Sequence, residues 1–330
     1  MARYLVRRLL YMVPTLWAVS VVSFFIIQLP PGNFVVEQVS RLQAEGATTH
    51  AAEIAQLKAQ YGLDQPFWVQ YWRWISGIVL RGDFGQSFEW SRPVATMIHD
   101  RLAITVAIAL GALLISWLIA FPIGIYSAAR QYSLGDYVFT TIGFLGLAIP
   151  HFLLALVFMY IAFRYFGQSP GGIFSHAYED ADWNLGKLLD LVQHLWVPII
   201  IIGTGGTAGL IRVLRANLLD ELHKPYVVTA RAKGLSETRL LLKYPVRTAL
   251  SPFISTVGWV LPALVSGGVI VEVVLNLPTT GPLLLRALMA QDMYLAGAFI
   301  LLLSMLTVVG TLVSDLLLAW LDPRIRYRYR

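Results

Sequence analysis

The sequence predicts an all-α integral membrane protein with six transmembrane helices. Of its 330 residues, 57% are hydrophobic and only 13% are charged, whereas a soluble domain carries about 25% charged residues. Several apolar runs reach the roughly 20 residues that a helix needs to cross a bilayer. The expected helices cover residues 9–29, 104–128, 138–163, 195–214, 253–275 and 294–320.

The first of these helices begins like a signal peptide, because Arg3, Arg7 and Arg8 precede an apolar run. The run is as long as a membrane span and ends in a Leu-Pro-Pro-Gly sequence at 29–32, with no small-x-small cleavage site. We therefore expect residues 1–30 to form a retained transmembrane helix.

Prolines and glycines inside the expected helices indicate bends and close packing. Membrane helices tolerate proline because neighbouring helices satisfy the freed carbonyls, and the prolines concerned are Pro14, Pro122, Pro150, Pro198 and Pro262. The fourth helix is rich in glycine, at Gly203, Gly205, Gly206 and Gly209. Small residues let helices approach closely, and a moving interface is the alternative interpretation.

The distribution of charge predicts the orientation. Sixteen of the 25 Lys and Arg residues fall in the N-terminus, 129–137, 212–250 and 321–330, and the other side holds nine basic against twelve acidic residues. The positive-inside rule makes the first side cytosolic. Residues 321–330 are then a basic cytosolic tail, whose place beside the membrane suits anionic lipid better than nucleic acid.

Residues 31–102 form an external segment that is too long for a simple connection. Its first part carries apolar residues at helical spacing, from Phe34 to Leu42, and its second part carries Trp68, Tyr71, Trp72 and Trp74. Aromatic side chains collect at membrane interfaces, so surface helices resting on the membrane are expected. A docking surface for an external partner is the alternative.

The cytosolic loop 212–250 is expected to be structured. Pro225 can begin a short helix because its missing N–H would be unpaired there. Gly234 can end that helix in the left-handed conformation, and Ser236 can cap a second helix that continues through Leu240. A short helix lying across the cytosolic surface has the shape of a plug for a groove on another protein.

Four residues of this short helix are expected to contact the partner. The small side chains of Ala230 and Ala232 allow close approach and are predicted to face the groove. Arg231 and Lys233 are predicted to make polar contacts at its rim.

Two carboxylates fall in or near apolar spans, where an acid usually faces protein or a water-filled path. Glu272 precedes the turn-rich segment 275–282, so it is a candidate for the outer gate of a path, with a helix–helix hydrogen bond as the alternative. For Asp315 the hydrogen bond is favoured.

Several catalytic motifs are missing from the sequence. It contains no phosphate-binding Gly-x-x-x-x-Gly-Lys-Ser/Thr loop, no His-Glu-x-x-His pair and no Gly-x-Ser-x-Gly elbow. It has no cysteine, and its six histidines show no metal-ligand spacing. We therefore expect no catalytic residue, no metal site and no enzyme.

The sequence resembles, from end to end, the permease subunits of ATP-binding-cassette importers of the dipeptide and oligopeptide type. The matching residues are Arg7-Arg8-Leu9, Pro14, Pro31-Gly32, Tyr61 to Pro66, Gln70-Tyr71, Gly82 to Ser87, Thr229 to Leu235, Glu272, Pro278, Gly281, Asp292 and Asp322 to Arg324. The most specific match is Thr229 to Leu235.

The resemblance implies the six-helix fold of a type I importer permease, with a core over 103–320, in a bacterial inner membrane with both termini cytosolic. It implies a second, similar permease subunit, two cytosolic ATPases that bind ATP and Mg, and an external solute-binding protein. This chain would hold no cofactor and would form half of the translocation path.

The resemblance also assigns residues to two roles. The ATPase-coupling element would comprise Tyr226, Thr229, Ala230, Arg231, Ala232, Lys233 and Gly234. The candidates for the path or its gate are Glu272, Pro278 and Gly281.

Departures from the family pattern bear mostly on the substrate. Val228-Thr229-Ala230 replaces the Glu-Ala-Ala of the general permease signature, which fits the peptide subgroup, while Asn33 and Thr279-Thr280 are external departures. A neutral or zwitterionic cargo is expected, di- or oligopeptides first and oligosaccharides second. A homodimeric or a heterodimeric permease pair both remain open.

The alternative of another class is an ATP-independent channel or secondary transporter. Such proteins often carry internal repeats or several charges at the midplane, and the sequence has neither.

Overall fold

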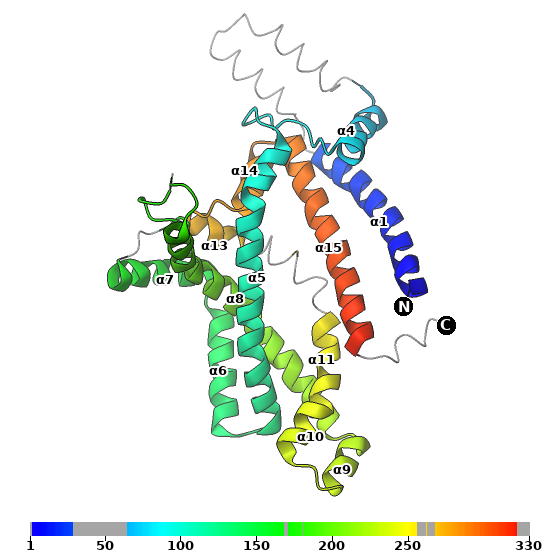
Figure 1. Cartoon of the computed structure of the whole chain (residues 1–330), viewed down its shortest axis with the longest axis vertical. Helices are drawn as coiled ribbons and strands as arrows, with labels where there is room; N and C mark the ends of the chain where they lie inside the picture. The colour runs from blue at the N-terminus through cyan, green and yellow to red at the C-terminus, as the bar shows by residue number, and fades with distance from the viewer. Residues whose placement is uncertain are drawn as a thin grey trace, which may run out of the picture. The chain divides into compact units, whose positions relative to one another are not determined.

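The computed structural model describes residues 2–28, 65–167, 171–179, 181–255, 262 and 268–321, and most of them are helical (Figure 1). Within these ranges no strand occurs, and the one isolated antiparallel bridge joins Gln86 and Pro93. The helices are α1 (Ala2–Gln28), α4 (Phe67–Arg81), α5 (Val94–Ala129), α6 (Leu134–Ala148), α7 (His151–Phe166), α8 (Leu185–Leu222), α9 (Pro225–Ala232), α10 (Glu237–Lys243), α11 (Pro245–Ser255), α13 (Val269–Val274), α14 (Thr280–Met289) and α15 (Met293–Leu321). The all-α prediction is confirmed.

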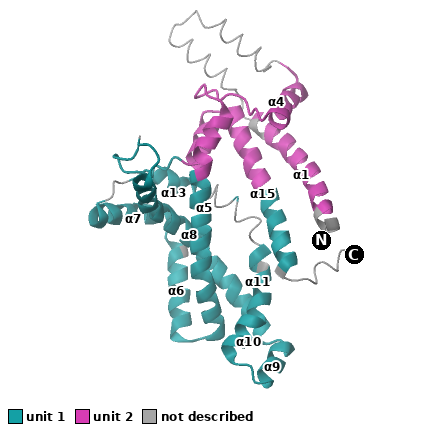
Figure 2. Cartoon of the chain, viewed as in Figure 1, with its two compact units in different colours: residues 1–5, 104–278, 307–330 teal, residues 6–103, 279–306 magenta. Residues whose placement is uncertain are grey.

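The helices belong to two compact units, coloured separately in Figure 2. The first comprises Met1–Leu5, Ile104–Pro278 and Thr307–Arg330, and the second comprises Val6–Ala103 and Thr279–Leu306. Each unit is described by itself.

Four helices of the described chain are long and apolar enough to cross a membrane. They are Val6–Phe25, Val94–Ala129, Leu185–Leu222 and Met293–Trp320, and the bent pair α6–α7 makes a fifth. The four long helices match the first, second, fourth and sixth expected spans, and the bent pair matches the third. The middle of the remaining span, 253–275, lies outside the described residues, as do 29–64 and the basic tail after 321.

The expected continuous helix over 138–163 is wrong, because the structure breaks it at Ile149 and Pro150. The two pieces meet at an angle of 98°. Pro150 cannot donate the next intrahelical bond and restricts the residue before it, and Ile149 accordingly adopts φ −85° and ψ 123°. Pro14, Pro122 and Pro198, by contrast, stay inside α1, α5 and α8.

Side-chain caps fix the starts of two helices in the first unit. Ser133 accepts a hydrogen bond from the amide of Asp136 at α6, and Asn184 accepts one from the amide of Lys187 at α8. Each cap satisfies an amide that the first helical turn leaves without a partner. The α8 helix therefore begins at Leu185, ten residues before the expected start of the fourth span at residue 195.

Close packing explains two of the four glycines of α8. A Cβ at Gly203 would lie 2.8 Å from the carbonyl oxygen of Ala112, and one at Gly205 would lie 2.8 Å from Nε2 of His151. Nothing lies within 4 Å of a Cβ at Gly206 or Gly209. The packing interpretation holds for the first pair only.

The second unit has a small core of its own. The first turns of α5 pack against α14 and α15 through Val94, Met97, Leu283, Leu295 and Phe299, all nearly inaccessible to solvent. Two hydrophobic clusters of the first unit join α5, α7, α8 and α13, and α5, α8 and α11.

Candidate functional site

The short helix α9 forms where the sequence predicts it. Pro225 occupies the first turn after an extended Lys224 (φ −68°, ψ 145°), where its missing N–H costs nothing. Gly234 follows the helix with φ +79°, a conformation that only glycine adopts without strain. Both local predictions are confirmed, while the role of the helix stays a prediction.

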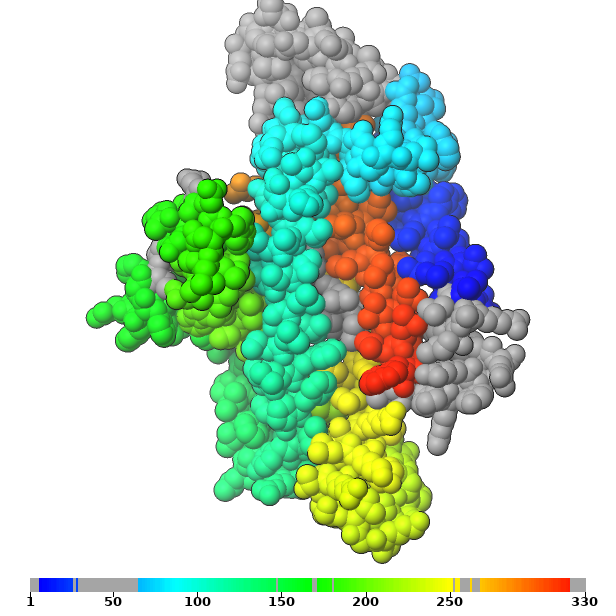
Figure 3. Space-filling model, viewed as in Figure 1, coloured from blue at the N-terminus to red at the C-terminus, as the bar shows by residue number. Residues whose placement is uncertain are grey.

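The side of α9 that carries Ala230 packs against α10. Val227, Ala230 and Leu240 form a buried cluster with Leu235 and Tyr244 at its edge, and the atoms of α9 and α10 make one contiguous body in the space-filling view (Figure 3). Ala230 is only 9% exposed. The prediction that Ala230 faces a partner's groove is therefore wrong, because the residue lies in the contact that holds the two short helices together.

Ser236 stands at the N-cap of α10, as predicted, but its hydroxyl makes no capping hydrogen bond. The first turn of α10 instead carries Glu237, which is bound by Arg231 of α9. The guanidinium donates from Nε to Oε1 at 2.5 Å and from its NH2 group to Oε2 at 3.1 Å. This ion pair holds the pKa of Glu237 below its usual range.

Arg231 is thus engaged inside the loop in this structure. The Arg231 side chain nevertheless stays 49% exposed. Lys233 is exposed after the last turn of α9, so both predicted rim cations remain accessible.

Two further residues of the predicted set have partners close in sequence. Tyr226 donates a hydrogen bond to Glu221 of α8, and partial burial together with this bond raises the pKa of Tyr226 to about 12. The phenol therefore keeps its proton at neutral pH. The hydroxyl of Thr229 donates to the carbonyl of Pro225 at 2.9 Å, an i to i−4 bond along the helix.

Of the alanine pair, only Ala232 lies on the accessible side of α9, where Val228 and Thr229 join it. At 100° per residue, Val228, Ala232 and Thr229 lie opposite Val227 and Ala230, and all three are exposed, Val228 by 54%. Val228 is a candidate contact that sequence reasoning missed. Its spacing of four from Ala232 was the signal that could have found it.

The body of α9 and α10 is mounted on the long helices of the first unit. Leu214 and Leu218 of α8 are fully buried with Val246 and Ala249 of α11 and Ala128 of α5. Burying an aliphatic side chain of this size contributes about 2 kcal/mol. Leu241 of α10 packs against this cluster, so close-packed side chains join the body of α9 and α10 to α8 and α11.

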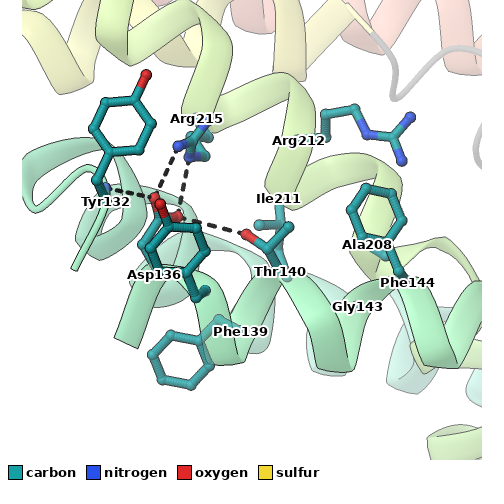
Figure 4. Close-up of a pocket in the computed structure, with 11 residues that line it drawn as sticks. Tyr132, Asp136, Phe139, Thr140, Gly143, Phe144, Ala208, Ile211, Arg212 and Arg215 are labelled. Carbon is teal, nitrogen blue, oxygen red and sulfur yellow. Dashed lines mark hydrogen bonds and ion pairs between the residues drawn. The ribbon is translucent and has the colours of Figure 1, made fainter. Parts of the chain in front are cut away.

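A buried ion pair joins α6 to α8 near the same end (Figure 4). Arg215 donates from Nε to Oδ1 of Asp136 at 3.1 Å and from its NH2 group to Oδ2 at 2.8 Å. The Asp136 side chain is 4% exposed and also accepts from the amide of Tyr132 at 3.0 Å. The two-point geometry fixes the rotation of α8 relative to the start of α6.

Beside this pair lies a cavity of about 320 Å³ between α6 and α8. Its walls include Gly143, Phe144 and Ala208, and Figure 4 shows Arg212 and Phe144 on the same side of it. The Arg212 guanidinium lies 5.2 Å from the centre of the Phe144 ring, which is a cation–π contact.

Of the path candidates, Glu272 lies in α13 and is 1% exposed. Its Oε1 atom is only 3.0 Å from where a Cβ of Gly268 would stand, so the glycine leaves room for the carboxylate. The end of α13 is tied to the loop after α7, since the amide of Gly172 donates to the carbonyl of Leu275 at 2.9 Å.

The other two path candidates belong to different units. Pro278 is exposed and ends this stretch of the first unit. Gly281 is buried in the first turn of α14 and belongs to the second unit. In the described residues no group of three or more His, Asp or Glu side chains is placed to hold a metal ion.

Comparisons with known proteins identify the kind of protein these features belong to. Residues 120–327 match the family described as "Binding-protein-dependent transport system inner membrane component", and residues 1–109 match the N-terminal region of such membrane components. The matched region contains α6 to α11 and the body of α9 and α10.

Two curated relatives cover nearly the whole chain. One is an oligopeptide transport system permease protein, AppB, of Bacillus subtilis, 35% identical over 99% of this chain and 100% of its own length. The other is a glutathione transport system permease protein, GsiC, of Salmonella paratyphi A, 34% identical over 99% of this chain and 100% of its own length.

A solved structure of the MetNI methionine transporter, in an inward-facing conformation, shares the fold. It matches with a TM-score of 0.51 at 14% identity and covers 68% of this chain and 96% of the matched chain. At this identity the likeness concerns the fold alone.

Proposed function

The chain belongs to the family of inner membrane components of binding-protein-dependent transport systems, and on that premise we propose that it is the permease subunit of an ATP-driven importer of short peptides. Members of this family are transport components rather than enzymes. We assign this chain half of the translocation path and the contact that receives force from a cytosolic ATPase.

The observation that supports the coupling assignment is that α9 has one exposed side and one packed side. Its exposed side offers Val228, Thr229 and Ala232, which are small enough to enter a groove. Its other side is locked to α10 and, through the mount on α8 and α11, to the membrane helices. A helix that is accessible on one side and rigidly held on the other suits the transfer of motion from a partner.

The proposed partners are a second permease subunit of the same kind, two ATPases on the cytosolic side and an external solute-binding protein. ATP and Mg bind to the ATPases, and this chain needs no cofactor. ATP shifts the transporter between two conformations only if these bind ATP with different affinities. We assign to α9 the transmission of this conformational change to the membrane helices.

We propose short peptides as the cargo because relatives that cover the whole chain are named for oligopeptide and glutathione transport. Oligosaccharides are the second candidate. The nearly balanced external charge, nine basic and twelve acidic residues on the proposed external side, suits a neutral or zwitterionic solute.

For the path we retain Glu272, Pro278 and Gly281 as candidates. The strongest support comes from Glu272, because a buried carboxylate in an apolar helical region usually faces a pathway or a partner within the protein.

Reconstitution tests the function directly. The whole transporter, with its ATPases and binding protein, is expected to accumulate labelled di- to pentapeptides in proteoliposomes only when ATP is supplied. Competition by oligosaccharides but not by peptides would overturn the cargo. Uptake that does not require ATP would overturn the transporter class.

The orientation is tested separately, in the bacterial inner membrane, by single cysteines in a chain that has none of its own. We expect Ser133→Cys and Ser236→Cys to resist an impermeant thiol reagent in intact cells. His176→Cys, at a side chain that is 93% exposed, is expected to react. Labelling of Ser236→Cys from outside would reverse the proposed topology.

A further inference from the structure

One side of α4 is apolar, aromatic and exposed. Trp68, Trp72, Val79 and Leu80 are 64%, 69%, 72% and 80% exposed. At 100° per residue, Trp68, Trp72 and Val79 lie within 40° of one another along the helix, and Leu80 flanks them. Two indole rings and two aliphatic side chains are a large apolar surface to leave in water.

The opposite side of α4 is fastened to α1. Tyr71 and Ser20 share a hydrogen bond of 2.8 Å between their hydroxyl oxygens, in a buried position. The ring of Phe24 lies 5.4 Å from that of Phe67 and 5.3 Å from that of Trp74. These contacts fix both the position and the rotation of α4.

The contacts on α1 also set the depth of α4. Ser20 and Phe24 lie inside the membrane-crossing stretch Val6–Phe25, and Gln28, which donates to Gln70 of α4 at 2.8 Å, lies just beyond it. A helix that touches both the last turns of a span and the residues after it lies at the boundary between hydrocarbon and headgroups. Its exposed side at that depth meets lipid rather than bulk water.

We propose that α4 is an interfacial helix whose exposed side, formed by Trp68, Trp72, Val79 and Leu80, inserts into the bilayer leaflet around the C-terminal end of α1. Tryptophan favours this zone because its ring is apolar and its N–H can reach polar headgroups. The exposed cations Arg73 and Arg81 extend their charges toward the phosphates.

The chain leaves the leaflet where α4 ends. Gly82 closes the helix in the left-handed conformation, with φ 65°, and its amide donates to carbonyls of the last turn. The exposed polar residues Asp83 and Glu89 follow. The inserted stretch is therefore bounded at residue 81. The inference rests on the membrane span of α1 and is independent of the cargo and of the ATPase contact.

Nitroxide labels test the depth in the fully assembled transporter in liposomes, since the chain has no native cysteine. Trp72→Cys and Leu80→Cys carry the label on α4. Val22→Cys, an exposed position inside the span of α1, is the lipid reference, and Glu89→Cys is the water reference. The measured quantity is the ratio of collision rates with oxygen and with a water-soluble nickel chelate.

We expect this ratio at positions 72 and 80 to be several-fold above that at position 89 and close to that at position 22. A ratio equal to that at position 89 would place the helix in water and overturn the proposal. Low collision rates with both reagents would show that protein covers this side, which also overturns it. Val79→Cys, at an equally exposed position, replaces Trp72→Cys if loss of the indole impairs assembly.

Discussion

The hydroxyl of Ser87 donates a hydrogen bond of 2.5 Å to Oδ2 of Asp292, although the two residues lie 205 positions apart. Both belong to the residues that carry the family resemblance, and neither is exposed. Asp292 also accepts from the amides of Glu89 and Leu295, and by accepting from Leu295 its carboxylate caps the first turn of α15. One carboxylate thus closes the loop after α4 onto the start of the last span.

Asp292→Ala is expected to lower the thermal unfolding temperature of the purified transporter. Removing the carboxylate leaves the Ser87 hydroxyl and two amides without an acceptor. Each unsatisfied buried group lowers the free energy of unfolding by about 1–3 kcal/mol. Ser87→Ala removes one donor to Asp292 and the acceptor of the Trp90 amide but keeps the carboxylate, and it should lower the temperature less. An unchanged midpoint for both variants would contradict a structural role of this contact.

The same carboxylate predicts a pH effect. Burial raises the pKa of Asp292, against the opposing effect of its hydrogen bonds. The native state then holds the proton more tightly than the unfolded chain, so the free energy of unfolding falls as the pH rises from the ordinary value to the raised one. Asp292→Asn should flatten this dependence in thermal melts over that window, and an identical slope in both proteins would count against it.

The two alanines of α9 are expected to respond differently to the same enlargement. Ala232→Trp alters the exposed side and should leave the unfolding temperature unchanged while abolishing the stimulation of ATP hydrolysis by loaded binding protein. Ala230→Trp overfills the contact with Leu240, which costs about 1–3 kcal/mol, and should lower the unfolding temperature. Full stimulation in Ala232→Trp would refute the coupling assignment of this side.

Gly234 is predicted to be needed for its backbone conformation alone. Nothing lies within 4 Å of a Cβ built there, while φ is +79°. Gly234→Asn should retain most of the stimulated hydrolysis, because asparagine tolerates the left-handed region. Gly234→Val should lose it, at a backbone cost of about 1–2 kcal/mol. Equal loss in both variants would point to a steric requirement instead.

Removing Arg215 should destabilise the junction of α6 and α8. Arg215→Met leaves the buried Asp136 carboxylate without its two-point partner, and losing hydrogen bonds to a charged group costs about 2–3 kcal/mol. Arg215→Lys restores the charge without the fork and should recover only part of the stability. The measurement is the unfolding midpoint, and full recovery with lysine would show that geometry is unimportant there.

Glu272→Gln is expected to reduce peptide uptake while expression stays normal. The amide keeps the size and one acceptor atom of this buried side chain but removes the charge. Glu272→Asp, which keeps the charge on a shorter stem, is the matched variant. Unchanged uptake in the glutamine variant would mean that the carboxylate only packs.

Sequence reasoning succeeded where the signal is local. Pro225 and Gly234 mark their helix because missing donors and positive φ are properties of single residues. The apolar runs likewise located α1, α5, α8 and α15. The burial of Ala230 could not be predicted from local sequence, because it depends on the tertiary contact that Leu240 of α10 makes with α9.

The break at Pro150 shows the same limit in the membrane helices. Pro122 and Pro198 remain inside long helices while Pro150 ends one, although all three interrupt similarly apolar sequence. The neighbouring helices decide which outcome holds, through whether they satisfy the freed carbonyls. Composition carries no information about those neighbours.

The length of α8 has a mechanical consequence. Its 38 residues extend over about 57 Å at 1.5 Å per residue, and only two residues separate its last turn from α9. A tilt of about 5° at the Asn184 end would sweep the far end through about 5 Å, the pitch of one helical turn. Along a single rod the displacement grows with distance from the pivot, so about 2.5–3 Å at the glycine-rich middle of α8 becomes about 5 Å where α9 begins.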